Sequence, residues 1–142
     1  GEFYESKKPY FDLVSQLGTG DRIIFHSHFI SDDEVKYYFS AASLVVQPYK
    51  SATQSGVTQI AYHFNKPMIV TNVGGLAEIV PDGVSGYVVE PDPVAIAGAI
   101  CDSFSGDEKR FEAGIEKKKK EYSWSRLTEA LHSLVREVQR AR

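Results

Sequence analysis

The stretch that decides the fold runs from Leu44 to Thr71 and reads Leu-Val-Val-Gln-Pro-Tyr-Lys-Ser-Ala-Thr-Gln-Ser-Gly-Val-Thr-Gln-Ile-Ala-Tyr-His-Phe-Asn-Lys-Pro-Met-Ile-Val-Thr. It begins with a short apolar run that ends at Pro48, which is typical of a buried strand. A loop of small polar residues follows, and an apolar stripe with helical spacing comes next: Val57, Ile60, Ala61 and Phe64. A second apolar run, residues 67–71, completes the stretch. This order predicts two buried strands joined by a helix.

The same alternation continues on both sides of this stretch. Strands are predicted at residues 22–26 and 85–90, and helices at residues 6–17, 31–42 and 92–104. Two more helices are expected, from about residue 107 to 121 and from about 125 to 142. Short apolar strands separated by helices predict a doubly wound parallel sheet, hence an α/β fold in a single domain. The alternative, an α+β fold, needs hairpin-joined strands, for which the sequence offers a turn only near Asp82-Gly83.

Two helix starts and one buried face can be assigned from local patterns. Ser31 and Glu34 have the spacing of a capping box, and Asp92-Pro93 is typical of an N-cap followed by the first helical residue. The helix after Pro93 is expected to bury one apolar face that consists of Ala97, Ile100, Cys101 and Phe104.

Composition excludes several classes of protein. The chain has 142 residues, of which 42% are hydrophobic and 25% charged, and its net charge is −3. A strongly basic nucleic-acid binder is therefore not expected. The single cysteine, Cys101, excludes an internal disulfide framework and favours a reducing compartment such as the cytoplasm. No apolar run has the roughly 18–20 residues of a membrane span.

The loop after the first strand of the decisive stretch is a candidate phosphate site. Open parallel sheets bind ligands at the carboxyl ends of their strands. Thr53, Gln54, Ser55 and Gly56 lead directly into a helix, and Lys50 precedes them. A helix N-terminus offers unpaired N–H groups and a partial positive charge, so it can hold a phosphate. A polar N-cap loop without a ligand is the alternative interpretation.

A second glycine-containing loop follows the next strand. Gly74 and Gly75 lie between that strand and a short helix, where the lack of side chains would let the backbone approach a ligand; a plain tight turn is the alternative. No Asp or Glu occurs between Val35 and Ala77, although this stretch contains three lysines. The charge pattern favours an anionic ligand and disfavours a magnesium site, unless the clustering is due to chance.

Three motifs in one order resemble a known family. The small-residue loop and its helix are followed by Asn72-Val-Gly-Gly-Leu-Ala-Glu78 and by Asp82-Gly-Val-Ser-Gly86. From Gly1 to about residue 104 the chain resembles the C-terminal, donor-binding domain of a GT-B glycosyltransferase of the group 1 type (family four). The resemblance implies a Rossmann-like half of a two-domain enzyme that transfers a hexosyl group from a nucleotide-sugar. It implies no metal or other cofactor, and it implies an N-terminal Rossmann-like domain as partner.

The resemblance also implies which residues contact the donor. The donor or phosphate set would consist of Lys50, Thr53, Gln54, Ser55, Gly56, Thr58, Gly74 and Gly75. Phe29 and Ile30 would lie near the nucleotide base. No catalytic residue can be assigned, because the basic residues that hold the diphosphate in this family would precede Gly1. We therefore expect the chain to be an excerpt that is inactive alone.

The sequence departs from the family at two positions. The family has two glutamates eight residues apart, the second seven residues before the proline of the next strand, and those positions are Ala52 and Ile60 here. Gln54, Thr58 or Gln59 could substitute for them. The loss of both carboxylates favours an alternative function, a non-catalytic GT-B-like binding or association module. A receiver-like signalling domain is disfavoured, since no acidic phosphoacceptor follows a strand.

Overall fold

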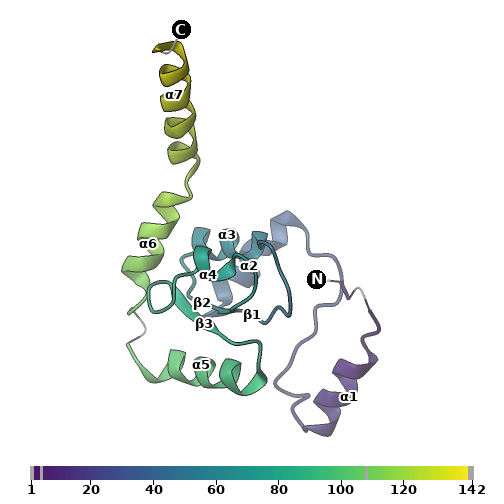
Figure 1. Cartoon of the computed structure of the whole chain (residues 1–142). Helices are drawn as coiled ribbons and strands as arrows, with labels where there is room; N and C mark the ends of the chain where they lie inside the picture. Colours follow the sequence, from purple (N-terminus) through teal and green to yellow (C-terminus); the bar gives the residue numbers. More distant parts are fainter. Residues whose placement is uncertain (1, 4, 108, 141–142) are drawn as a thin grey trace. The chain divides into compact units, whose positions relative to one another are not determined.

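The structure is a computed structural model, and it describes residues 2–3, 5–107 and 109–140. The chain divides into two compact units, residues 1–38 and 39–142. The first unit contains α1 (Lys8–Gln16) and most of α2 (Asp32–Ala41). The second unit contains the sheet and the remaining helices (Figure 1). Their bounds are β1 (Val45–Gln47), α3 (Gly56–His63), β2 (Met68–Thr71), α4 (Leu76–Ile79), β3 (Gly86–Val89), α5 (Pro93–Ser105), α6 (Glu112–Glu121) and α7 (Trp124–Arg140).

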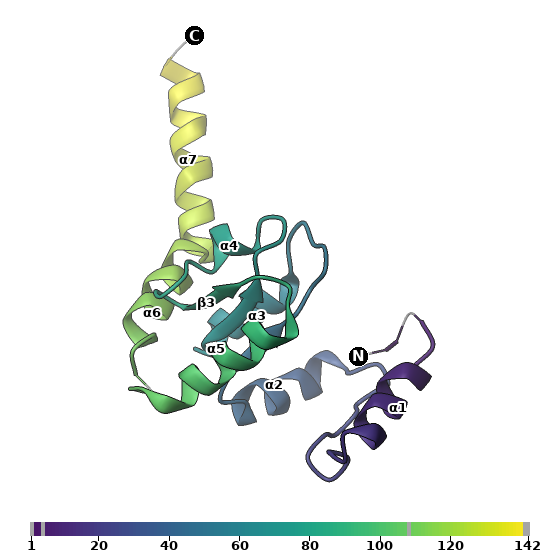
Figure 2. The ribbon, with the colours of Figure 1, turned by 60° about the horizontal axis from the view of Figure 1, so that its bottom comes forward.

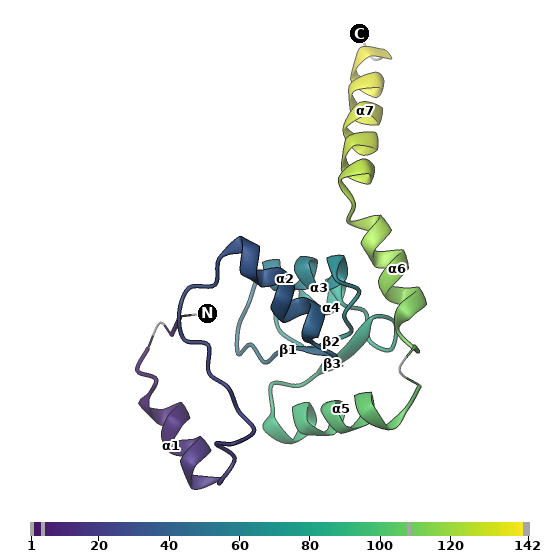
Figure 3. The ribbon, with the colours of Figure 1, turned by 180° about the vertical axis from the view of Figure 1, so that it is seen from behind.

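The sheet of the second unit is parallel, with the strand order β1-β2-β3. Helices α3 and α4 lie on one face of it and α5 on the other, as Figures 1 and 3 show from opposite sides; Figure 2 shows the side of α5. All four residues of β2 are buried, as expected for a central strand covered on both faces. The core extends from β2 to α3 and α6 through Tyr62, Met68, Val70 and Ile115. The predicted α/β fold with a doubly wound parallel sheet is confirmed.

The strand predicted at residues 22–26 is wrong. This segment has no regular secondary structure, and no strand of the described residues pairs with it. Ile24 is 81% exposed and Ile23 is 42% exposed, so the apolar run that suggested a buried strand is not buried. A strand requires a hydrogen-bonding neighbour, and apolar composition alone does not provide one.

The buried face predicted for α5 is wrong except at Ile100, which is half-buried. Cys101 is exposed and Phe104 is 65% exposed, whereas Ala99 is the buried residue of this helix. The side chains that α5 does bury or half-bury include those of Ile96, Ala99, Ile100 and Ser103, which lie on one side of the helix. The Ser103 hydroxyl donates to the Ala99 carbonyl at 2.8 Å, so a polar residue occupies the last inward position. That serine interrupts the apolar pattern and explains the incorrect assignment.

The Asp-Gly-Val-Ser-Gly motif builds the turn before β3. Gly83 has a φ of +70°, a conformation that favours glycine. Asp82 Oδ1 accepts a 2.9 Å hydrogen bond from the Val88 N–H. A Cβ on Gly86 would lie 1.8 Å from the Met68 carbonyl oxygen, so only glycine lets β3 pair this closely with β2. The motif is therefore structural.

Candidate functional site

The candidate site lies at the carboxyl ends of β1 and β2, where the loops 48–55 and 72–75 meet. The Gly75 N–H donates to the Thr53 carbonyl at 3.1 Å. Gly74 has a φ of +54°, and a Cβ there would lie 1.6 Å from the Ala52 carbonyl oxygen. The two glycines are therefore needed for the contact between the loops. Whether they also approach a ligand stays a prediction.

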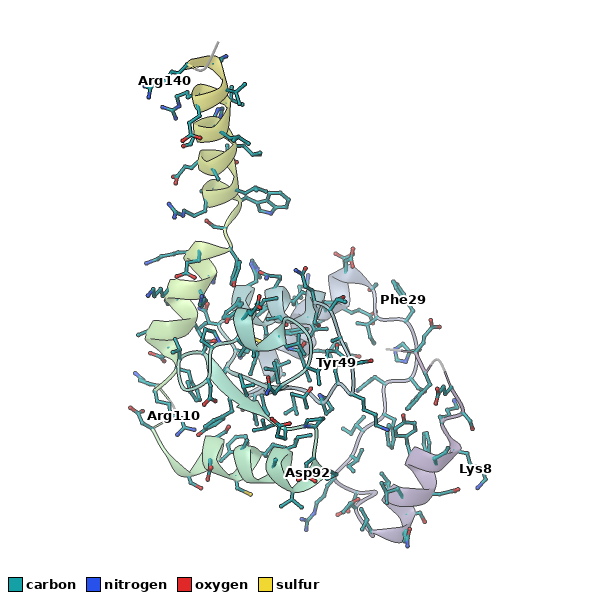
Figure 4. The ribbon with its side chains drawn as sticks, viewed as in Figure 1. Lys8, Phe29, Tyr49, Asp92, Arg110 and Arg140 are labelled. Atoms are coloured by element: carbon teal, nitrogen blue, oxygen red, sulfur yellow. The ribbon has the colours of Figure 1, made fainter. Side chains whose placement is uncertain are left out.

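Hydrogen bonds hold the loop 48–55 at both ends. Thr71, the last residue of β2, donates its hydroxyl to the Tyr49 carbonyl at 2.6 Å. The Tyr49 hydroxyl lies 3.3 Å from Ser55 Oγ, and either group can donate in this hydrogen bond. Tyr49 follows β1 and packs partly against the core (Figure 4). The loop that precedes α3 is thus positioned by the ends of both strands.

A buried polar pair connects β1 to the first turn of α3. Gln47 and Thr58 are 2% and 0% exposed. The Thr58 hydroxyl donates to Gln47 Oε1 at 3.3 Å, and Gln47 Nε2 lies 3.7 Å from the Met68 sulfur. The Thr58 side chain is therefore directed into the core, contrary to the donor contact that the family resemblance implied for it. The sequence did not lead us to predict this role of Gln47. A polar residue at the end of an apolar strand would have indicated that it bonds to another buried polar group.

The first turn of α3 has open donors. Ser55 has the extended backbone of an N-cap residue, with φ −135° and ψ 123°, yet its side chain does not cap the helix. Within the described part of the chain, the N–H groups of Gly56 and Val57 have no hydrogen-bond partner. Gly56 is exposed, and a Cβ on it would have no neighbour within 4 Å. An uncapped helix start that faces open space is suited to an anion.

The charges around this helix start are favourable for an anion. The first turn of α3 contains no acidic residue, and the sequence from Val35 to Ala77 contains none either. Lys50 is exposed and has no hydrogen-bond or ion-pair partner among the described residues. Lys66, by contrast, donates to the Ser40 carbonyl at 3.1 Å. The described residues contain no group of three or more His, Cys, Asp or Glu that could hold a metal ion.

The remaining predicted donor residues differ in exposure. Thr53 and Gln54 are exposed, and Ser55 is half-buried. Ala52 and Ile60, which occupy the positions of the family's glutamates, are both half-buried. The side chains that could substitute for a glutamate are therefore the exposed amides of Gln54 and Gln59.

The residues predicted to lie near the nucleotide base belong to the first unit. Phe29 is 72% exposed and Ile30 is half-buried. Only one half of the capping box predicted after them forms: Glu34 Oε2 accepts from the Ser31 N–H at 3.1 Å, but the Ser31 hydroxyl donates to the same carboxylate at 2.8 Å and caps no backbone N–H. These hydrogen bonds lower the pKa of the Glu34 carboxyl. The contact of Phe29 and Ile30 with a base stays a prediction.

A separate cavity of about 560 Å³ lies beside the C-terminal half of α3. Its wall includes Tyr62, His63, Lys119, Tyr122 and Trp124. Lys119 is engaged there, since its ammonium donates to the His63 carbonyl at 2.9 Å and to Asn65 Oδ1 at 2.8 Å. The cavity is not at the carboxyl ends of the strands, and its residues are not among those that form the helix start.

Comparison with known proteins decides the family. Residues 4–105 match the family described as glycosyl transferases group 1. The chain belongs to the group 1 glycosyltransferases. The D-inositol 3-phosphate glycosyltransferase of Mycolicibacterium vanbaalenii is 32% identical over 121 residues, which cover 84% of this chain and 27% of that protein. An uncharacterised glycosyltransferase of Methanocaldococcus jannaschii is 31% identical over 111 residues, or 76% of this chain and 32% of that protein.

Solved structures of other proteins share the fold. Sucrose-phosphate synthase from Thermosynechococcus elongatus matches the whole chain with a TM-score of 0.78 at 24% identity, over 38% of its own length. HepE of Anabaena, solved in complex with UDP, matches 92% of the chain with a TM-score of 0.73 at 17% identity, over 36% of its length. The expected Rossmann-like half of a GT-B fold is confirmed. This group 1 glycosyltransferase chain spans about a third of the length of the proteins that it matches.

Among the described residues, no helix is both long and apolar enough to cross a membrane.

Proposed function

We propose that residues 1–142 are the nucleotide-sugar-binding half of a glycosyltransferase that transfers a hexosyl group to an acceptor. The observation that carries the proposal is the start of α3, where Gly56 and Val57 have open N–H groups and the first helical turn contains no acidic residue. A related fold, HepE of Anabaena, has been solved with UDP-glucose, which supports a nucleoside diphosphate sugar as the donor class. UDP is therefore the first nucleotide to test.

In the proposed reaction, this half stabilises the leaving group. The bond between the anomeric carbon of the sugar and the diphosphate oxygen breaks, and the electron pair remains on the diphosphate. The N–H groups of the first turn of α3 and the ammonium of Lys50 would stabilise the charge that develops there. The acceptor hydroxyl attacks the anomeric carbon, and its proton is passed to the released nucleoside diphosphate. We propose that these donors act without a metal ion.

We propose further that an N-terminal Rossmann-like domain of the same protein completes the enzyme. The chain spans about a third of its relatives, which leaves room for such a domain. Helix α7 supports the proposal, because Leu127, Leu131, Leu134 and Val138 share one face and are 49–57% exposed. A helix with a continuous apolar face needs a surface to cover that face.

The second candidate function is a non-catalytic binding module. The observation that favours it is the replacement of both family glutamates, by Ala52 and by Ile60. A module of this kind would keep the anion site at the start of α3 and bind the nucleotide, but it would not transfer the sugar. The two candidates therefore agree on binding and differ on turnover.

The test uses the protein expressed from its full-length gene. Calorimetric titration with UDP measures binding, and UDP release from UDP-glucose in the presence of acceptor sugars measures turnover. Binding with turnover is the expected result, whereas binding without turnover supports the module. The absence of binding to UDP and to GDP contradicts both candidates. Residues 1–142 alone are expected to show no turnover above background, and robust activity from them would contradict the two-domain proposal.

A further inference from the structure

Ser55 is in the position of a helix cap but does not act as one. Serine is among the preferred N-cap residues, and there its hydroxyl normally accepts from the N–H of the second or third helical residue. The backbone of Ser55 is extended, as capping requires. Its hydroxyl nevertheless lies 3.3 Å from the Tyr49 hydroxyl and forms no hydrogen bond with the helix. The Thr58 N–H bonds to the Ser55 carbonyl at 3.2 Å instead.

Tyr49 is held by contacts with the sheet and the core. The Tyr49 carbonyl accepts from Thr71 Oγ1 at 2.6 Å, and Thr71 is 1% exposed at the end of β2. The Tyr49 side chain packs against the core cluster that contains Met68 and Val70. The sheet thus holds Tyr49, and its side chain places the hydroxyl 3.3 Å from Ser55 Oγ.

We propose that Tyr49 is a positioning residue of the donor site. Its hydroxyl keeps Ser55 Oγ away from the first turn of α3, so that the Val57 N–H stays available to the diphosphate beside that of Gly56. Without the Tyr49 hydroxyl, Ser55 Oγ rotates onto the helix start and accepts from the Val57 N–H. The serine then competes with a phosphate oxygen for this donor. This inference rests on the proposed binding of a nucleoside diphosphate at α3.

The proposal predicts an effect of Tyr49→Phe that depends on Ser55. In the protein expressed from its full-length gene, Tyr49→Phe should weaken UDP binding about five-fold, the equilibrium equivalent of a typical N-cap interaction. In a Ser55→Ala background no hydroxyl can cap the helix, so adding Tyr49→Phe should leave the affinity unchanged. Calorimetric titration of UDP into the parent, the two single variants and the double variant measures this cycle. The melting temperature of Tyr49→Phe should not fall below that of the parent.

The outcomes separate this inference from the function on which it rests. A parent that binds neither UDP nor GDP overturns the proposed function and the role of Tyr49 with it; if only GDP binds, the cycle is measured with GDP. If the parent binds, an equal loss of affinity in both backgrounds, or no loss in either, overturns the positioning role alone. An unfolded or clearly less stable Tyr49→Phe protein overturns it too, because the Tyr49 hydroxyl would then stabilise the fold. A loss seen only where Ser55 is present supports it.

Discussion

Helices α3 and α5 lie in the same unit but begin in opposite ways. At α5, Asp92 Oδ2 accepts from the Ala95 N–H at 2.9 Å, and Pro93 contributes no N–H to the first turn. At α3, the Ser55 side chain does not cap the helix and the N–H groups of Gly56 and Val57 lack partners among the described residues. The start of α5 holds a carboxylate and leaves only the Val94 N–H without a partner among the described residues, whereas the start of α3 leaves two N–H groups open and has no acidic residue in its first turn.

This difference indicates that α3 is held in place by its buried side chains and not by its cap. Thr58, Ala61 and Tyr62 are almost completely buried, whereas α5 buries only Ala99. A helix anchored in this way can leave its first donors unpaired at little cost in stability. The exposed helix α5 gains more from a cap. The comparison can be tested at each helix separately.

The largest effect is expected from Gly56→Val. Its methyl groups would occupy the space in front of the open N–H groups, while no neighbour lies within 4 Å to clash with the new Cβ. UDP binding to the protein expressed from its full-length gene should weaken at least about ten-fold, because charge-assisted hydrogen bonds are lost. Calorimetric titration measures the loss.

The matched control for this substitution is Gly98→Val in α5, where a Cβ also meets no neighbour within 4 Å. It should leave the affinity for UDP unchanged. Equal affinities of the Gly56→Val protein and the parent would show that the start of α3 is a plain loop.

Tyr62→Phe tests the anchoring of α3. The buried Tyr62 hydroxyl donates to the Ile79 carbonyl at 2.7 Å and lies 2.8 Å from Ser85 Oγ. Its removal leaves buried polar groups without their partner, so the free energy of unfolding of residues 1–142 in urea should fall by about 2 kcal/mol. An unchanged urea midpoint would mean that α3 is held by other contacts.

The same variant has a predicted pH signature. Burial raises the pKa of Tyr62 from its usual value of 10.0 to about 12. The unfolded state therefore loses this proton first, and the stability associated with neutral Tyr62 is lost as the pH rises from about 10 to 12. The free energy of unfolding of the parent should fall more steeply over that range than that of Tyr62→Phe. Parallel curves for the two proteins would contradict the raised pKa.

Ile60→Glu compares two neighbouring positions on α3. Ile60 is half-buried and Gln59 is exposed. A carboxylate at position 60 loses part of its hydration without a bound cation, so stability should fall by about 1–2 kcal/mol. Gln59→Glu should change stability by less than about 0.5 kcal/mol. Thermal melts of both variants measure the difference, and a melt of Ile60→Glu that matches the parent would show that this position can accept the family's glutamate.

The smallest effect concerns the two cap positions. Asp92→Ala removes a cap that is formed and should lower the free energy of unfolding by about 1 kcal/mol. Ser55→Ala removes only the hydrogen bond to Tyr49, so it should cost less. Urea denaturation of the two variants side by side gives the comparison. A larger loss at Ser55 than at Asp92 would mean that Ser55 caps α3 in solution.

Most of the sheet could be predicted from the sequence because its strands are marked by local patterns. The apolar runs that became β1, β2 and β3 are bounded by Pro48, Pro67 and the Asp82-Gly83 turn. Residues 22–26 show the limit of such patterns, since apolar composition does not reveal whether a neighbouring strand exists. The inward face of α5 was missed because Ser103 occupies an inward position.

The candidate site could be predicted only in its outline. The small residues before α3 indicated an anion site, and the structure brings Thr53 and Gly75 into hydrogen-bond contact there. The direction of a side chain is not encoded locally, so Thr58 was assigned to the donor although it bonds to Gln47 in the core. The hydrogen bond between Tyr49 and Ser55 also depends on the tertiary position of β2, through Thr71.

The central claim is that the open start of α3 binds the diphosphate of a nucleotide donor. A crystal structure of the protein expressed from its full-length gene, grown with UDP, tests it most directly. We predict that phosphate oxygens lie about 2.7–3.2 Å from the backbone nitrogens of Gly56 and Val57, while the capped start of α5 at Asp92 has no ligand. A UDP molecule whose phosphates contact neither Gly56 nor Val57 would contradict the claim.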